Sequence, residues 1–288
     1  MKQYFILLVL LLLLMGCSSV ESSGSSKGET LEIKGSDTLL ELISAAAENF
    51  RQVHPDIKIT VTGGGSGTGM AALLNKEIDV ATSSRPMKEE EMTMATQKGL
   101  EPIQEFLIAR DMLSIIVHPS NRVFELTVDE LAAIYSGKIT NWQEVSGEDT
   151  EITLYGRQST SGTYTFFMEE IVKGDYSPRM RNMEGSQAIV DAVSQDTSGI
   201  GYVGIGYVVD EHDLPLRSIR LVSVGTSKGG PYFSSIDETS YDYYPINRPL
   251  YLYSSEAELN PARDLFFEFM LSPSGQTVVE NTGFVSIR

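Results

Sequence analysis

Short runs rich in serine, threonine and glycine follow four predicted strands, each where a strand ends and a helix is expected. Hydroxyl groups donate hydrogen bonds, and glycine lets a ligand come close to the backbone. The first N–H groups of a helix are unpaired and lie at the positive end of its dipole. Such groups together can bind an oxyanion. The runs are residues 35–38, 63–69, 82–86 and 157–163.

Helix capping is the alternative explanation of these runs. Serine, threonine and aspartate cap helices whether or not a ligand is present, so any one run by itself indicates a cap. Four runs, one of them the Gly/Ser/Thr stretch 63–69, favour a shared anion site instead.

Arg157 is the charged residue that best fits such a site. It follows a predicted strand and precedes Ser161 by four positions, so its guanidinium can lie beside the N–H groups of the next helix. The planar fork of a guanidinium suits a tetrahedral oxyanion. The alternative is a surface arginine that forms a salt bridge with Asp175 or Glu184.

The elements that must position these groups alternate between short strands and helices, which is the pattern of an α/β protein. The expected strands are 31–34, 57–62, 78–81 and 151–155, and the expected helices are 39–50, a short helix through 74, and 164–172.

Motifs of other binding and catalytic sites are not matched. The glycine run fits neither the dinucleotide nor the nucleoside-triphosphate template, and no serine lies in G-x-S-x-G. His54, His118 and His212 lack metal-ligand spacing, so we expect no metal, no cofactor and no catalytic residue. The acidic clusters 89–91 and 169–170 are interpreted as solvated helix faces. A hydrolase whose triad forms only on folding stays open as an alternative.

The N-terminus predicts export. An apolar run over residues 4–15 follows Lys2, and it is shorter than the roughly 20 residues that span a bilayer. We therefore predict a signal peptide at residues 1–16. The sequence Leu14-Met15-Gly16-Cys17 resembles the lipobox of bacterial lipoproteins, which implies cleavage before Cys17 and its acylation, for example with palmitate. An uncleaved anchor is the alternative, and both place the folded part outside the cytoplasm.

The rest of the chain is expected to be a globular domain on a tether. Residues 17–28 are polar and rich in serine and glycine, which predicts a flexible tether. Cys17 is the one cysteine of the sequence, so stability must come from the core and not from disulfides. The net charge of −17 argues against nucleic acid and anionic membrane surfaces as partners. It does not exclude an anionic ligand, because local donors govern a buried site.

The chain resembles the phosphate-binding proteins (PstS) of Pst-type ABC transporters over nearly its whole length after the signal peptide. The motifs that carry the resemblance are residues 35–38, 65–69, 79–85, 157–163, 249–253 and 266–285, with Leu271-Ser272-Pro273-Ser274-Gly275-Gln276 similar to the family's C-terminal helix.

This resemblance implies a type II periplasmic-binding-protein fold. Two α/β lobes are then joined by two crossing strands, near residues 112–118 and 244–253, and the ligand binds in the cleft between them. Lobe one is expected to comprise residues 29–113 and 250–288, and lobe two residues 114–249. The implied protein is a monomeric, extracytoplasmic, lipid-anchored solute-binding protein that delivers inorganic phosphate to the permease subunits of an ABC transporter. A sensor or adhesin for phosphate or another oxyanion, built on the same fold, is the alternative.

The resemblance also implies the ligand contacts. Some members of the family have an aspartate where this chain has Ser84, and an acidic residue at the position of Ser159. We hypothesise that Asp37 replaces the missing acceptor for the proton of phosphate; a plain helix cap is the alternative. The other implied ligands are Thr38, the Leu39 amide, Ser66 and Ser84 of lobe one, and Arg157, Ser161, Gly162 and Thr163 of lobe two.

Overall fold

The computed structural model describes residues 30–210, 214–257 and 259–287. The predicted signal peptide, the predicted tether with Cys17, and His212 lie outside the described residues.

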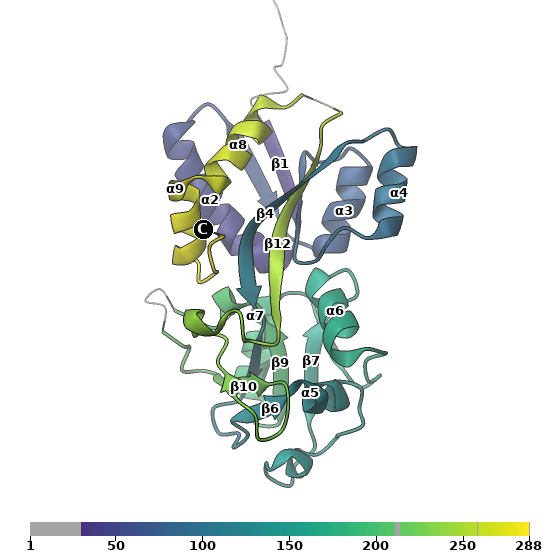
Figure 1. Ribbon diagram of the computed structural model, residues 1–288, viewed down its shortest axis with the longest axis vertical. Helices are drawn as coiled ribbons and strands as arrows, with labels where there is room; N and C mark the ends of the chain where they lie inside the picture. The colour runs from purple at the N-terminus through teal and green to yellow at the C-terminus, as the bar shows by residue number, and fades with distance from the viewer. Residues whose placement is uncertain (1–29, 211–213, 258, 288) are drawn as a thin grey trace, which may run out of the picture.

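Two sheets form the centres of two lobes, which lie one above the other in Figure 1. In the first sheet, β1 is parallel to β2 and β3, whereas β12 is antiparallel to β3 and β4. Its strands, in spatial order, are β2 (Lys58–Thr62), β1 (Thr30–Gly35), β3 (Val80–Ser83), β12 (Asn247–Ser255) and β4 (Ile103–Met112).

The second sheet is mixed, with β7 parallel to β8 and β9 and with β5 antiparallel to β9 and β10. Its strands, in spatial order, are β11 (Tyr232–Phe233), β10 (Arg220–Gly225), β5 (Ser114–Val117), β9 (Gly199–Val203), β7 (Thr153–Arg157) and β8 (Arg181–Met183), with β6 (Glu125–Thr127) paired to β10.

Amphipathic helices cover both sheets. In α2, the buried side chains Leu42, Ile43, Ala46 and Phe50 follow helical spacing. The helices of lobe one are α2 (Leu40–Val53), α3 (Ser66–Leu74), α4 (Glu89–Gln97), α8 (Pro261–Leu271) and α9 (Pro273–Asn281); those of lobe two are α5 (Val128–Tyr135), α6 (Gly162–Phe166), the π-helix η3 (Phe167–Val172) and α7 (Ser186–Gln195). Short 3-10 turns are η1 (Asp37–Leu39), η2 (Trp142–Val145), η4 (Ile205–Tyr207) and η5 (Glu238–Ser240).

Two antiparallel strands cross between the lobes. The chain leaves the first sheet at the end of β4, enters the second sheet at Ser114, and returns along β12. β12 pairs with β4 from Asn247 opposite Met112 to Ser255 opposite Ile103. Figure 1 shows this pair running from the upper lobe into the lower one. The expected α/β architecture with two crossing strands is therefore confirmed.

The elements near the predicted ligands differ in detail from the sequence-based expectations. The strand expected at 151–155 runs two residues further, so Arg157 is its last residue. The helix expected at 164–172 begins at Gly162 and widens into η3 after Phe166. A helix does follow the run 82–86, but α4 starts only at Glu89, so this run is a loop before the helix and not its first turn.

Candidate ligand-binding site

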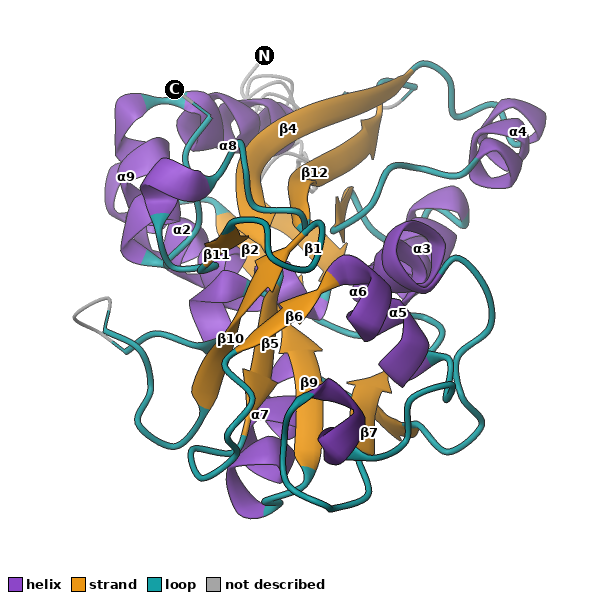
Figure 2. Ribbon diagram, turned by 60° about the horizontal axis from the view of Figure 1, so that its bottom comes forward, coloured by secondary structure: helices purple, strands orange, loops and turns teal. Residues whose placement is uncertain are grey.

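The predicted ligand residues meet where the two lobes touch. The hydroxyls of Thr38 and Thr163 lie 3.0 Å apart across the interface. The Gly67 amide at the start of α3 donates to the Thr160 carbonyl before α6, at 3.0 Å. Figure 2 shows α6 lying beside α3. The ends of strands that are distant in sequence thus converge on one buried site.

Glycines allow the segments of lobe one to approach one another. Gly35 has a φ of 149°, and a Cβ there would lie 2.2 Å from the Thr82 carbonyl oxygen. Gly65 precedes α3 with a φ of 96°. Both conformations are costly for residues with side chains. They bring η1, the start of α3 and the end of β3 together, which places Thr38, Ser66 and Ser84 in one group.

Ser84 reaches this group from a loop. Its backbone N–H donates to the Ser66 hydroxyl at 3.1 Å, and the two hydroxyls lie 3.4 Å apart. The neighbouring Arg85 is not directed to the site, because its guanidinium forms two hydrogen bonds with Glu91 at 2.6 and 2.8 Å. Ser84 therefore contributes its hydroxyl without a helix dipole behind it, while its amide binds Ser66.

Some of the predicted donors already have partners within their own turns. The Leu39 amide donates to the Ser36 carbonyl at 3.1 Å. The Ser161 hydroxyl oxygen accepts from the amides of Thr163 and Tyr164 at 3.2 and 3.4 Å, which is the geometry of a helix cap. Because a hydroxyl that accepts these bonds keeps its own proton, Ser161 can still donate to a ligand.

Arg157 is buried at the end of β7, with 1% of its surface exposed. Its Nη2 donates to the Asp37 carboxylate and to the Glu184 carbonyl oxygen, and its Nη1 lies 3.4 Å from the Ser186 hydroxyl. The alternative of a surface salt bridge with Asp175 or the Glu184 carboxylate is wrong. Its Nε has no hydrogen-bond partner among the described residues.

Asp37 makes contacts beyond its own helical turn. One carboxylate oxygen accepts from Arg157 across the interface, and the other accepts from the Gly64 amide at 2.8 Å. These contacts are not those of a plain helix cap. The carboxylate partner of Arg157 thus comes from the other lobe. The predicted role as acceptor for a phosphate proton stays a prediction.

Two tyrosine hydroxyls hold these residues in place. Tyr202 accepts from the Arg157 amide at 3.3 Å, and Tyr207 donates to the Asp37 carbonyl at 2.5 Å. Burial raises the pKa of Tyr202 to about 12. Burial, followed by the Asp37 charge, raises the pKa of Tyr207 to about 12. Both hydroxyls are thus protonated at neutral pH.

Two charged residues of the crossing strands lie at the site and were missed by the sequence analysis. Arg248 of β12 donates to the Asp111 carboxylate of β4 at 2.7 and 2.9 Å, and both side chains are fully buried. Arg248 also lies 3.3 Å from the Thr38 hydroxyl. The available signal was a charge inside the expected crossing segment 244–253, Arg248, and one immediately before the segment 112–118, Asp111.

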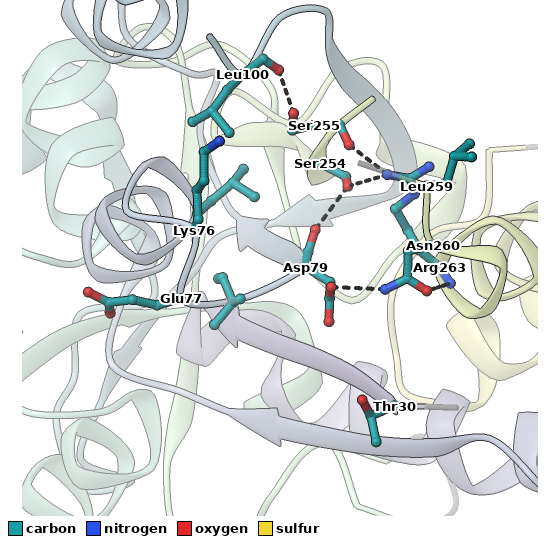
Figure 3. Close-up of a pocket in the computed structure, with 12 residues that line it drawn as sticks. Thr30, Lys76, Glu77, Asp79, Leu100, Ser254, Ser255, Leu259, Asn260 and Arg263 are labelled. Carbon is teal, nitrogen blue, oxygen red and sulfur yellow. Dashed lines mark hydrogen bonds between the residues drawn. The ribbon is translucent and has the colours of Figure 1, made fainter. Parts of the chain in front are cut away.

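A separate pocket lies in lobe one, between the C-terminal end of β12 and the segment after α3 (Figure 3). Its polar groups bind one another: Asn260 donates to the Asp79 carboxylate at 2.9 Å, and the Ser254 hydroxyl donates to the Asp79 carbonyl at 2.9 Å. None of the predicted ligand residues lines it. These contacts hold β3, β12 and α8 together.

Within the described ranges, no cluster of three or more histidine, cysteine or acidic side chains is suited to hold a metal ion. No helix in the same part of the chain has the length and apolar character needed to cross a bilayer.

Comparison with known proteins gives one consistent family. Residues 20–274 match the model of the PBP superfamily domain. The phosphate-binding protein PstS of Pseudomonas aeruginosa is 32% identical over 271 residues, covering 88% of this chain and 81% of the relative. PstS of Staphylococcus saprophyticus is 32% identical over 284 residues, covering 96% and 86%.

Solved structures agree with these relatives. A putative phosphate ABC transporter substrate-binding protein with bound phosphate, from Clostridium perfringens, superposes with a TM-score of 0.77 at 28% identity, covering 90% of this chain and all of that one. An ABC-type phosphate transport receptor from Vibrio cholerae gives a TM-score of 0.69 at 25% identity, covering 88% and 99%.

Proposed function

The chain belongs to the PstS phosphate-binding proteins of the PBP superfamily, and from this premise we propose that it captures inorganic phosphate between its lobes for an ABC transporter. The observation that carries the proposal is the buried Arg157, whose Nε lacks a partner among the described residues and whose guanidinium contacts Asp37 of lobe one and Ser186 of lobe two. A buried donor without a partner is costly unless a ligand accepts its proton.

We propose that the ligand contacts come from both lobes. Thr38, Ser66, Ser84 and the Leu39 amide bind the anion from one side, and Arg157, Ser161, Gly162 and Thr163 bind it from the other. Hydroxyls suit this task because they donate to oxyanion oxygens and accept the proton of monohydrogen phosphate. Asp37 is proposed to hold Arg157 and to accept a phosphate proton.

The proposed mechanism is hinge closure around the anion. Because each lobe holds part of the donors, the full set of ligand contacts forms only when the lobes meet. The antiparallel pair of β4 and β12 is the connection about which they would move. The closed form is then the state that the transporter recognises.

Binding without chemical conversion is part of the proposal. The side-chain partners of Ser66, Ser84 and Thr163 are other hydroxyls, and none of these is a general base that could activate a nucleophile. The family is one of solute-binding proteins, which agrees with this view.

We further propose that the protein is monomeric and held outside the cytoplasm by a lipid on Cys17, after removal of residues 1–16, with residues 17–28 as tether. The lobe boundaries are proposed at 113/114 and 249/250. The first of them is supported by the strands that each sheet contains, since β4 ends at Met112 and β5 starts at Ser114.

Calorimetry of the purified protein against phosphate, sulfate and molybdate at two pH values tests the proposal. Phosphate should give the strongest binding, without turnover of phosphate esters. An absence of phosphate binding would refute the main claim. Loss of phosphate uptake on deletion of the gene separates a transport protein from a sensor or adhesin.

A further inference from the structure

Arg248 lies where the two crossing strands meet both lobes. Its strand β12 belongs to the hinge, its partner Asp111 lies on the other hinge strand, and its guanidinium lies 5.5 Å from the ring centre of Phe166 in lobe two. It is 3.3 Å from the Thr38 hydroxyl and 3.4 Å from the Ser84 carbonyl oxygen. Thr38 and Ser84 are both among the proposed phosphate ligands.

The hydrogen bonds of Arg248 leave donor capacity at the site. A guanidinium has five N–H groups. Nε and Nη2 donate to one oxygen of Asp111, Nη2 also donates to Thr38, and Nη1 donates to Ser84. The second N–H of Nη1 therefore has no acceptor among the described residues. The contacts to Thr38 and Ser84 are at the long end of hydrogen-bond distances, so an anion oxygen could replace them.

Asp111 fixes the orientation of this guanidinium. Its other oxygen accepts from the Ile205 amide at 2.9 Å, so both oxygens already have donors. Burial lowers the pKa of Arg248, and the Asp111 charge opposes that shift. Since an arginine in a protein keeps its proton, the site holds two guanidinium groups, Arg157 paired with Asp37 and Arg248 paired with Asp111.

We propose that Arg248 is a second guanidinium ligand of the bound oxyanion, donating from the hinge while Asp111 holds its other edge. The inference rests on the proposed phosphate function and deepens it. Arg157 binds from lobe two and Arg248 from the crossing strands, so the anion contacts both lobes and the hinge. This adds a guanidinium donor to the ligand contacts without a change in net charge, because Asp111 balances Arg248.

The alternative is that Arg248 and Asp111 form only a structural ion pair. Replacing Arg248 alone does not separate the two, because it leaves the Asp111 charge buried without a partner. The combined variant Asp111→Asn with Arg248→Met does separate them. It changes no net charge, keeps an acceptor for the Ile205 amide, and fills the volume of the arginine stem with methionine.

The experiment compares this double variant and Arg248→Lys with the wild-type chain by phosphate calorimetry and thermal melting. The double variant should melt cooperatively and bind phosphate about tenfold or more weakly, as expected for the loss of a charged hydrogen bond. Arg248→Lys keeps the charge, but an ammonium group lacks the planar fork that can donate to Asp111 and to an anion at the same time. This variant should therefore also bind phosphate more weakly. The matched control, Arg122→Gln with Glu148→Gln, removes an exposed ion pair of lobe two and should bind as the wild type does.

The outcomes separate the inference from the proposed function. If Arg248→Lys or the folded double variant binds phosphate as tightly as the wild type, Arg248 is not a ligand of the anion. The proposed phosphate-binding function still stands in that case, provided that the wild-type chain binds phosphate. If the double variant does not fold, Arg248→Lys decides the question. A wild-type chain that binds no phosphate overturns both.

Discussion

Gly162 offers the sharpest test of closure, because it lies against lobe one with no room for a side chain. A Cβ at this position would lie 2.2 Å from the Ser66 hydroxyl oxygen and 2.7 Å from that of Ser84. Ordinary contacts of this kind are 3.4–4 Å. In Gly162→Ala the added methyl group therefore overlaps lobe one by more than a small adjustment can relieve.

The hydroxyls that the methyl group meets cannot easily move. Ser66 and Ser84 are fully buried, and the Ser66 oxygen accepts from the Ser84 amide at 3.1 Å. Forcing an extra methyl group into a packed site costs about 1–3 kcal/mol. The methyl group has room when the lobes are apart, so it destabilises only the closed form. The free energy of phosphate binding falls by the same amount, which corresponds to an affinity about 5- to 150-fold weaker.

Titration calorimetry with phosphate measures the loss, and thermal melting without phosphate checks the fold. Gly162 is the first residue of α6, where alanine favours the helix, so lobe two should not be weakened. Gly174→Ala is the matched control, since its Cβ would meet only the Val172 carbonyl oxygen at 4.0 Å. Wild-type affinity in Gly162→Ala would show that the lobes do not approach this closely around bound phosphate.

Three further predictions concern charge and attachment. Arg157→Ala should weaken phosphate binding by about 2–5 kcal/mol because a buried anion loses its charged partner; calorimetry with Arg122→Ala as an exposed control measures this, and unchanged affinity removes Arg157 from the site. Asp37→Ala should reduce the preference for phosphate over sulfate, since a carboxylate accepts the proton that sulfate lacks; an unchanged preference in competition calorimetry refutes that role. Cys17→Ser should move the protein from the membrane fraction to the soluble fraction without changing phosphate affinity, and retention in the membrane fraction would point to an uncleaved anchor.

The sequence predicted the fold and the general location of the candidate site. Strand and helix periodicity, with hydroxyl and glycine runs after the strands, indicated α/β lobes with ligands at strand ends. These patterns can be combined into one site because the carboxyl ends of parallel strands lie at the same edge of a sheet. The sequence also selected Arg157, which ends β7 and is buried at the interface between the lobes.

Capping could not be separated from ligand binding by sequence. The same residue types serve both purposes, and only the partners in space distinguish them. Ser161 caps α6, and the Ser84 loop precedes α4 by several residues. The loop forms because Arg85 bonds to Glu91 and the chain continues through Pro86 before the helix begins.

The ion pairs were decided by the tertiary structure alone. Asp37 and Arg157 are 120 positions apart and belong to different lobes, and Asp111 and Arg248 are 137 positions apart on the two crossing strands. No local pattern specifies such partners, because the pairing depends on how the lobes close and on the register of β4 with β12. The sequence by itself determined which residues could bind an oxyanion, whereas the packing of the lobes on their hinge decided which charges face it.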